Sequence, residues 1–380
     1  MTDPPPLAVY IHWPYCARIC PYCDFNVVRD RKQAEQGLLA DAIVRDLALQ
    51  AERLDGPRRL TSVFLGGGTP SLMEPQWAGR MIAAAQALWP THEAVEVTLE
   101  ANPTDAEAGR FARFEQAGVN RLSLGVQSLD DKALAMLGRN HSAAEARRAI
   151  DTAAAVFERV SVDLIYALPD QTPAAWAAEL AGVAAMGVEH ISPYQLTIEA
   201  GTAFDRLVRR GTLTPPDADA AAALYETTQA VLAAAGFEAY EVSNHARGRG
   251  ARSRHNLAYW RGWDYVGAGP GAHGRLTTPG GRIASLAEPK VADYIAAVSR
   301  GSSFRTIEAL DPREAAIERL LLGLRTLEGV LLADLSALAI DPATIADLEN
   351  QGFIARSGDR LTATAKGRAV LDRITADLIP

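Results

Sequence analysis

The chain has 380 residues, 48% of them hydrophobic and 22% charged, which predicts one large globular domain followed by a smaller one. Its formal net charge of −8 at pH 7 argues against a nucleic-acid partner, because such a partner requires a basic surface that neutralises phosphates. No apolar run approaches the ~20 residues that cross a bilayer, and the Met-Thr-Asp start is not typical of a secretory signal, so we expect a cytoplasmic protein without a transmembrane segment.

The first half of the chain alternates short apolar runs with helical stretches. The apolar runs predict strands at 7–11, 61–65, 94–100, 120–124, 160–166 and 190–195. The Ala-rich amphipathic stretches between them predict helices at 33–54, 76–88, 106–117, 143–156 and 174–186. Strands joined by helices form a parallel sheet, so we expect an α/β fold, an incomplete TIM-like (β/α)6 barrel. In such barrels the loops at the carboxyl ends of the strands form the active site.

Regularity falls after a further helix predicted at 217–235. The segment 247–282 is rich in Gly, Arg and aromatic residues, which indicates a functional crossing segment. Helices at 311–327, 331–337 and 342–350 and a hairpin over 353–363 then resemble a winged-helix module. We therefore expect a barrel over 1–240, a connecting segment over 241–304 and a winged-helix-like domain over 305–380. That last domain has 12 acidic and 9 basic residues, which favours a lid or packing role over DNA binding.

All three cysteines lie on the loop after the first predicted strand, at Cys16, Cys20 and Cys23. Three thiolates this close repel one another unless a cation or an iron–sulfur core offsets their charge. Such clustering is typical of a reducing compartment and not of a disulfide framework. Three ligands on a four-iron cluster leave one iron open for a small molecule. The alternative is a structural zinc with His12 as fourth ligand, although zinc sites usually take their ligands as two separated pairs.

Polar groups follow the next strands at the same edge of the predicted sheet. The run GGGTPS at 66–71 closes the second strand, and its bare backbone amides are predicted to approach a ligand. Glu100 and Gln127 end the third and fourth strands, and Asp163 lies within the fifth, where an unpaired charge is costly. Arg139 could form a bidentate contact with a carboxylate. For each residue taken singly, an ordinary structural role is the alternative.

Together these motifs resemble the radical S-adenosylmethionine (SAM) superfamily, and within it the oxygen-independent coproporphyrinogen oxidase family. The resemblance is carried by YIHWPYC at 10–16, GGGTPS at 66–71, EANP at 100–103, GVQS at 125–128 and DLIYALP at 163–169. It implies a 4Fe-4S cluster on the three cysteines and one bound SAM. It implies that SAM is held by Tyr10, Gly67, Gly68, Thr69 and Glu100, with the site extended by Tyr22, Gln127, Arg139 and Asp163.

Two departures from that family distinguish this chain. The oxidases carry a further cysteine two residues after the third, where this chain has Phe25, and they have a longer N-terminal segment. The shorter relatives without that cysteine are the HemW-type haem chaperones, whose H-N-x-x-Y-W motif matches 255–260 here. The match implies that His255 binds haem iron while Tyr259 and Trp260 cover the porphyrin. A core-packing Tyr–Trp pair with a hydrogen-bonded histidine is the alternative, and His273 is a second candidate ligand.

Three functions follow from these observations. The favoured one is a haem chaperone that binds haem and passes it to an acceptor apoprotein, with no catalytic residue assigned. The second is a radical SAM enzyme that oxidatively decarboxylates coproporphyrinogen III. Whether the protein is an enzyme therefore stays open. The third is a zinc-stabilised interaction protein. A homodimer is compatible with all three.

Overall fold

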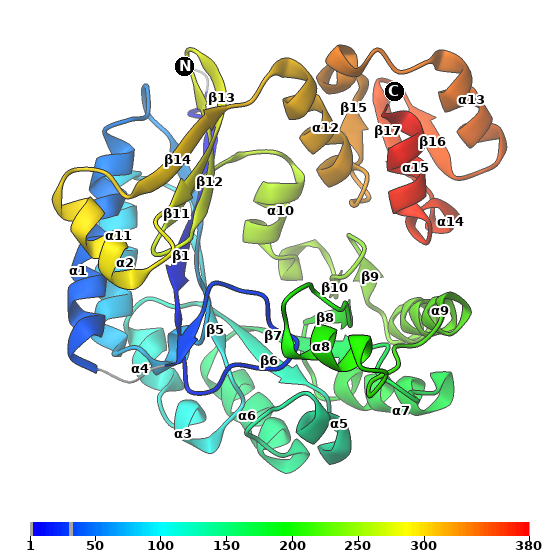
Figure 1. Ribbon diagram of the computed structural model, residues 1–380, viewed down its shortest axis with the longest axis horizontal. Helices are drawn as coiled ribbons and strands as arrows, with labels where there is room; N and C mark the ends of the chain where they lie inside the picture. The colour runs from blue at the N-terminus through cyan, green and yellow to red at the C-terminus, as the bar shows by residue number, and fades with distance from the viewer. Residues whose placement is uncertain (1–2, 30–32, 380) are drawn as a thin grey trace.

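The fold is α/β and is built on one mixed sheet of 12 strands in the order β14-β13-β12-β11-β1-β4-β5-β6-β7-β8-β10-β9 (Figure 1). The computed structural model describes residues 3–29 and 33–379. The central strands are β1 (Pro6–Trp13), β4 (Arg59–Gly67), β5 (Glu96–Ala101), β6 (Arg121–Gln127), β7 (Arg159–Tyr166) and β8 (His190–Gln195). They pair in parallel, in chain order, and they confirm the six predicted strands.

The helices between these strands pack along the outer side of the sheet (Figure 1). Four of the predicted helices are confirmed as α1 (Gln33–Ala51), α2 (Pro75–Leu88), α6 (Ala143–Val156) and α7 (Pro173–Ala184), and α9 (Ala218–Ala234) confirms the helix predicted after β8. The short helices α5 (Asp131–Met136) and α8 (Ala203–Arg209) were not predicted, and neither were four helices nearer the C-terminus, α10, α11, α14 and α15, whose bounds are given below.

The prediction of one continuous helix over 106–117 is wrong. The helix is broken into α3 (Asp105–Ala108) and α4 (Phe111–Gln116). Arg110 lies at the break, and its guanidinium donates to the carbonyl oxygens of Ser71 (2.8 Å) and Met73 (2.6 Å) in and beside the short 3-10 helix η1 (Pro70–Leu72). These contacts hold the break against the loop that carries the glycine motif.

The sheet does not close into a barrel, because further strands extend both of its ends. On the β1 side β11 (Asp264–Ala268) continues in parallel, followed by antiparallel β12 (His273–Thr278), β13 (Gly281–Ala287) and β14 (Phe304–Ala309). On the β8 side lie β10 (His245–Ala246) and β9 (Glu238–Ala239). The segment 247–282, expected to be a crossing segment, therefore contributes two strands to the sheet, together with η2 (Arg249–Ala251) and α10 (Arg254–Trp260).

Glycines explain why β11 and β12 are hard to see in the sequence. A side chain at Gly267 would place its Cβ 1.9 Å from the carbonyl oxygen of His273, so the two strands approach each other only because that side chain is missing. Glycine in a strand weakens the usual β-propensity signal. Helix α11 (Val291–Ser299) then covers α1 before β14 begins.

The C-terminal part has its own hydrophobic core. It contains α12 (Pro312–Gly323), β15 (Val330–Leu331), the 3-10 helix η3 (Leu332–Leu338), α13 (Pro342–Asn350), β16 (Ile354–Ser357), β17 (Arg360–Ala363), α14 (Ala365–Arg368) and α15 (Leu371–Leu378). The β16–β17 pairing confirms the predicted hairpin. The predicted domain boundaries stay predictions. Among the described helices none is both long and apolar enough to cross a membrane.

Candidate functional site

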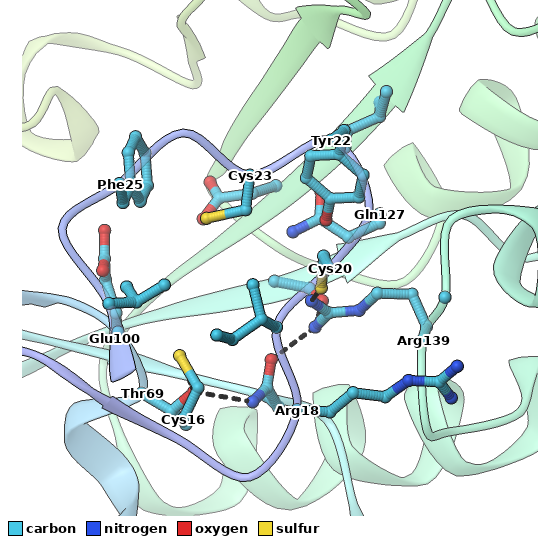
Figure 2. Close-up of a pocket in the computed structure, with 18 of the residues that line it drawn as sticks. Cys16, Arg18, Cys20, Tyr22, Cys23, Phe25, Thr69, Glu100, Gln127 and Arg139 are labelled. Carbon is cyan, nitrogen blue, oxygen red and sulfur yellow. Dashed lines mark hydrogen bonds between the residues drawn. The ribbon is translucent and has the colours of Figure 1, made fainter. Parts of the chain in front are cut away.

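The carboxyl ends of the parallel strands open onto a cavity of about 510 Å³ (Figure 2). Most of the residues that the sequence singled out line it. They are Cys16, Cys20, Tyr22, Cys23, Gly67, Gly68, Thr69, Glu100, Gln127, Arg139 and Asp163. These residues come from the loop after β1, from β4 to β7 and, for Arg139, from the turn after α5, so the fold brings together positions spread over some 150 residues of sequence. Tyr10 is the predicted SAM residue that does not line this cavity.

The cysteines lie on one loop whose two ends are closed together. Strand β2 (Tyr15–Cys16) pairs with β3 (Val28–Arg29), which closes the loop at its base. Near the end of the loop the Asn26 side chain donates to the carbonyl oxygens of Pro270 (2.8 Å) and Pro289 (2.9 Å). These contacts fix the end of the loop to the segments that precede β12 and α11.

His12 is already fully hydrogen-bonded within the protein. Its Nε2 donates to the backbone oxygen of Asn26 (2.8 Å), and its Nδ1 accepts from the Tyr10 hydroxyl (3.0 Å). Within the described ranges 3–29 and 33–379, no three His, Cys, Asp or Glu side chains are arranged to hold a single metal ion. The zinc alternative therefore loses the fourth ligand on which it depended.

The thiols make one another harder to ionise. The pKa of Cys16 is raised to about 11, mainly by burial and also by the neighbouring Cys23 and Cys20, against a hydrogen bond from the Thr69 hydroxyl that lowers it. Burial also raises the pKa of Cys23. Three thiolates in this cavity therefore need added positive charge to be stable at neutral pH. Three sulfur donors on one loop fit an iron–sulfur cluster, which supplies that charge.

The backbone amides of the glycine motif are not free, which corrects the expectation that they would approach a ligand. The Gly67 N–H donates to Glu100 (3.0 Å), the Gly68 N–H to the Trp13 carbonyl (2.7 Å) and the Thr69 N–H to the Tyr15 carbonyl (2.8 Å). A Cβ at Gly68 would lie 2.7 Å from the Tyr15 oxygen. The glycines therefore let the motif pack against the start of the cysteine loop.

Two carboxylates give the cavity a negative character. Burial, and then the nearby charge of Asp163, raise the pKa of Glu100 to about 7, against the Gly67 N–H bond that lowers it. Asp163 accepts from the Ser123 hydroxyl (2.8 Å), and burial raises its pKa as well. A cationic ligand would relieve the repulsion between these two groups.

Arg139 connects the cysteine loop to the ends of two strands, and its Nε has no hydrogen-bond partner among the described residues. Its guanidinium donates to the carbonyl oxygen of Gly125 (2.8 Å), to Cys20 Sγ (3.4 Å) and to the side-chain oxygen of Asn102. Figure 2 shows Arg139 beside Cys20. Gln127 has a φ of 65°, and left-handed backbone at a residue other than glycine is typical of functional sites.

Sequence reasoning did not select several residues that line the cavity. Asn102 donates to the Thr69 hydroxyl (3.2 Å), Ser123 binds Asp163, and Tyr194 lies near the end of β8. The available signal was position, because each lies on or just after one of the parallel strands. Asn102 was already part of the quoted EANP run.

A second cavity of about 740 Å³ adjoins the first. The residues Asp24, Phe25, Gly67 and Glu100 line both cavities. Phe25, 62% exposed, replaces the further cysteine of the oxidases at this shared wall. Tyr10 lines the second cavity and not the first.

His255 lines neither cavity. It is 1% exposed, its Nδ1 is hydrogen-bonded to Ser62 Oγ (3.0 Å) and its Nε2 to the Tyr259 hydroxyl (2.8 Å). Its ring stacks on Phe64 with centroids 4.8 Å apart, and burial lowers its pKa to about 3. This geometry is the core-packing alternative, since neither ring nitrogen is free to bind iron.

The chain matches the Radical SAM superfamily over residues 10–180 and the HemN C-terminal domain over residues 310–370. It is 40% identical to Radical S-adenosyl methionine domain-containing protein 1, mitochondrial, of Bos taurus, over 98% of this chain and 87% of that protein. It is 37% identical to Heme chaperone HemW of Mycobacterium tuberculosis, over 98% of this chain and 95% of that protein. The solved structure of coproporphyrinogen III oxidase (HemN) from Escherichia coli superposes with a TM-score of 0.81 at 20% identity, covering 99% and 90% of the two chains. That last likeness shows the fold alone.

The raised pKa of Glu100 makes the stability of the ligand-free protein depend on pH. Because the folded pKa of about 7 exceeds the ordinary value of 4.5, stability is lost as pH rises through that window. Glu100→Gln keeps an acceptor for the Gly67 N–H but removes the charge. We expect it to raise the free energy of unfolding at pH 8 by up to about 3 kcal/mol, at ~1.36 kcal/mol per pKa unit. Denaturant unfolding should show this gain shrinking toward zero at pH 4.5; a gain independent of pH would contradict the assignment.

Proposed function

The chain belongs to the radical SAM proteins of the HemW family, and from this premise we propose that it is a haem chaperone, which binds haem and passes it to an acceptor apoprotein. The observation that carries the proposal is likeness to Heme chaperone HemW over 98% of this chain, which includes the C-terminal domain as well as the cysteine loop. The acceptor's identity, a homodimer and the cytoplasmic location stay predictions.

The family implies a 4Fe-4S cluster and SAM. We assign the cluster to Cys16, Cys20 and Cys23, because their thiols share one cavity and are costly to ionise without added positive charge. With three protein ligands one iron stays open for the amine and carboxylate of SAM. When both are bound, a reduced cluster beside a sulfonium supplies one-electron chemistry.

The chain's own residues prepare the cavity for that pair. Glu100 and Asp163 favour a ligand that carries a sulfonium and an ammonium charge. Arg139 and the Thr69 hydroxyl donate to Cys20 and Cys16, which stabilises negative charge on sulfur. Because the amides of the glycine motif are used internally, we infer that its carbonyl oxygens face the SAM ammonium. Tyr22 and Gln127 extend the same wall.

Each cysteine is expected to be required for the cluster. Anaerobic reconstitution of the wild-type chain should give a brown protein containing iron and sulfide, and Cys16→Ala, Cys20→Ala and Cys23→Ala should each lose most of both. Val28→Ala is the matched control, since this side chain lies at the base of the same loop, is exposed and does not line the cavity. A colourless wild-type protein with stoichiometric zinc would refute the cluster assignment.

Handover of haem tests the function itself. Haem-loaded chain is mixed with apomyoglobin, which captures only haem that has dissociated, or with the apo form of a b-type cytochrome as acceptor. A chaperone should deliver haem to its acceptor faster than it releases haem to apomyoglobin, with a rate that rises with acceptor concentration. A delivery rate that never exceeds the release rate, across a panel of such acceptors, would count against a chaperone.

A further inference from the structure

The second cavity lies between three parts of the chain that are far apart in sequence. The cysteine loop contributes Phe25, helix α10 contributes Tyr259 and Trp260, and helix α12 of the C-terminal domain contributes Leu322. The β12–β13 hairpin closes the remaining side. Its volume of about 740 Å³ is within the ~300–1,000 Å³ of typical ligand sites.

The walls of this cavity are aromatic and apolar over much of their area. Tyr259 and Tyr265 meet edge to face with ring centroids 4.5 Å apart, and Trp260, Leu286 and Leu322 extend the same lining. Such a surface suits a large flat ring with an apolar body. The Arg325 guanidinium lies over the Trp260 ring at 4.7 Å and holds the indole in place.

One histidine of the chain is free to bind a metal in this cavity. All seven histidines lie in the described part of the chain. The buried ones are His12, His141, His190, His245 and His255. His92 is exposed but lines neither cavity. His273 is exposed, lines the second cavity, and has no hydrogen bond to either ring nitrogen from the described residues.

The position of His273 is fixed by the backbone before it. Gly271 has a φ of 76° and packs so closely on Asn26 that a Cβ would lie 2.5 Å from the Asn26 amide. Asn26 also binds the Pro270 carbonyl oxygen. The turn that presents His273 is therefore attached to the loop that carries the cysteines.

Cationic groups lie on the same face of the hairpin as His273. Arg275 follows two positions later on β12, about 7 Å along the strand, and alternate residues of a strand share a face. Arg275 (2.8 Å) and Arg282 (3.4 Å) share one carboxylate, that of Glu318. Arg282 also pairs with Asp264 (3.5 Å). The two lining guanidiniums lie on the hairpin, whereas Asp24 and Glu100 lie at the wall shared with the first cavity, so the hairpin is the part of the lining that suits the carboxylate groups of a ligand.

We propose that the second cavity is the haem site, in which His273 binds the iron, α10 covers the porphyrin face, and Arg275 and Arg282 receive the propionates. The assignment deepens the proposed haem chaperone and rests on it. It moves the iron ligand from the His255 of the H-N-x-x-Y-W motif to a residue outside that motif. His255 becomes a positioning residue, whose Nε2 holds the Tyr259 hydroxyl at the cavity wall.

The test is a titration of the full, cluster-reconstituted chain with haem, followed by its Soret and visible spectra. His273→Ala should lose the spectrum of histidine-ligated iron and weaken binding by about tenfold or more. His255→Ala should keep histidine ligation even if its affinity falls. His92→Ala is the matched control and should behave like wild type, and thermal unfolding of each variant shows that it has folded.

The outcomes separate this inference from the function on which it rests. If the wild-type chain gives no Soret shift, the haem chaperone proposal and this site both fail. If wild type binds haem and His273→Ala has the same spectrum and affinity, this site alone is wrong. If a folded His255→Ala loses histidine ligation of the iron while His273→Ala keeps it, then His255 is the iron ligand and this site is wrong.

The arginines give an independent readout. Arg282→Gln should keep the histidine-ligated spectrum but weaken haem binding by about tenfold, the order expected for one charge-assisted hydrogen bond. Haem dimethyl ester, which lacks the propionate charges, should bind wild type and Arg282→Gln equally. If Arg282→Gln does not change haem affinity, or if it weakens haem and the ester alike, the propionate contact is wrong.

Discussion

The two cavities depend on one structural constraint, which is the fixed position of the loop over residues 14–29. Asn26 connects that loop to both ends of a distant segment through the carbonyl oxygens of Pro270 and Pro289, and its own backbone oxygen accepts from His12. The first cavity lies on one side of this loop and the second on the other, with Phe25 at their shared wall. Any change that frees Asn26 therefore alters both sites together.

Charge distinguishes the two cavities. In the first, buried carboxylates and thiols repel one another, so the ligand-free site is costly to ionise and favours a positively charged cluster and cofactor. In the second, Glu100 and Asp24 lie only at the wall shared with the first cavity, and the two lining arginines, Arg275 and Arg282, lie on the β12–β13 hairpin with the aromatic walls. A sulfonium cofactor and an anionic porphyrin are thus directed to opposite sides of the same loop.

The sequence predicted the parts of this structure that local patterns specify. Runs rich in Val, Ile and Leu, such as the one around Val162, identify buried parallel strands, and the cysteine spacing identifies the cluster loop. Strands β11 to β14 were missed because glycine and arginine obscure the strand signal where hairpins pack closely. His255 looked like a ligand because its partner Ser62 lies 193 positions away along the chain and is brought close only by the fold. The contact between Asn26 and Pro270, which fixes the cysteine loop, spans 244 positions. Contacts over such separations leave no local pattern.

The central claim is that a cluster and a haem occupy neighbouring cavities on either side of one loop. Electron paramagnetic resonance of the reduced cluster, recorded before and after one equivalent of ferric haem is bound, tests it most directly. Neighbouring paramagnetic centres should broaden the cluster signal and shorten its spin relaxation, and His273→Ala should weaken that effect. A cluster signal that tightly bound haem leaves unchanged would place haem elsewhere and contradict the account.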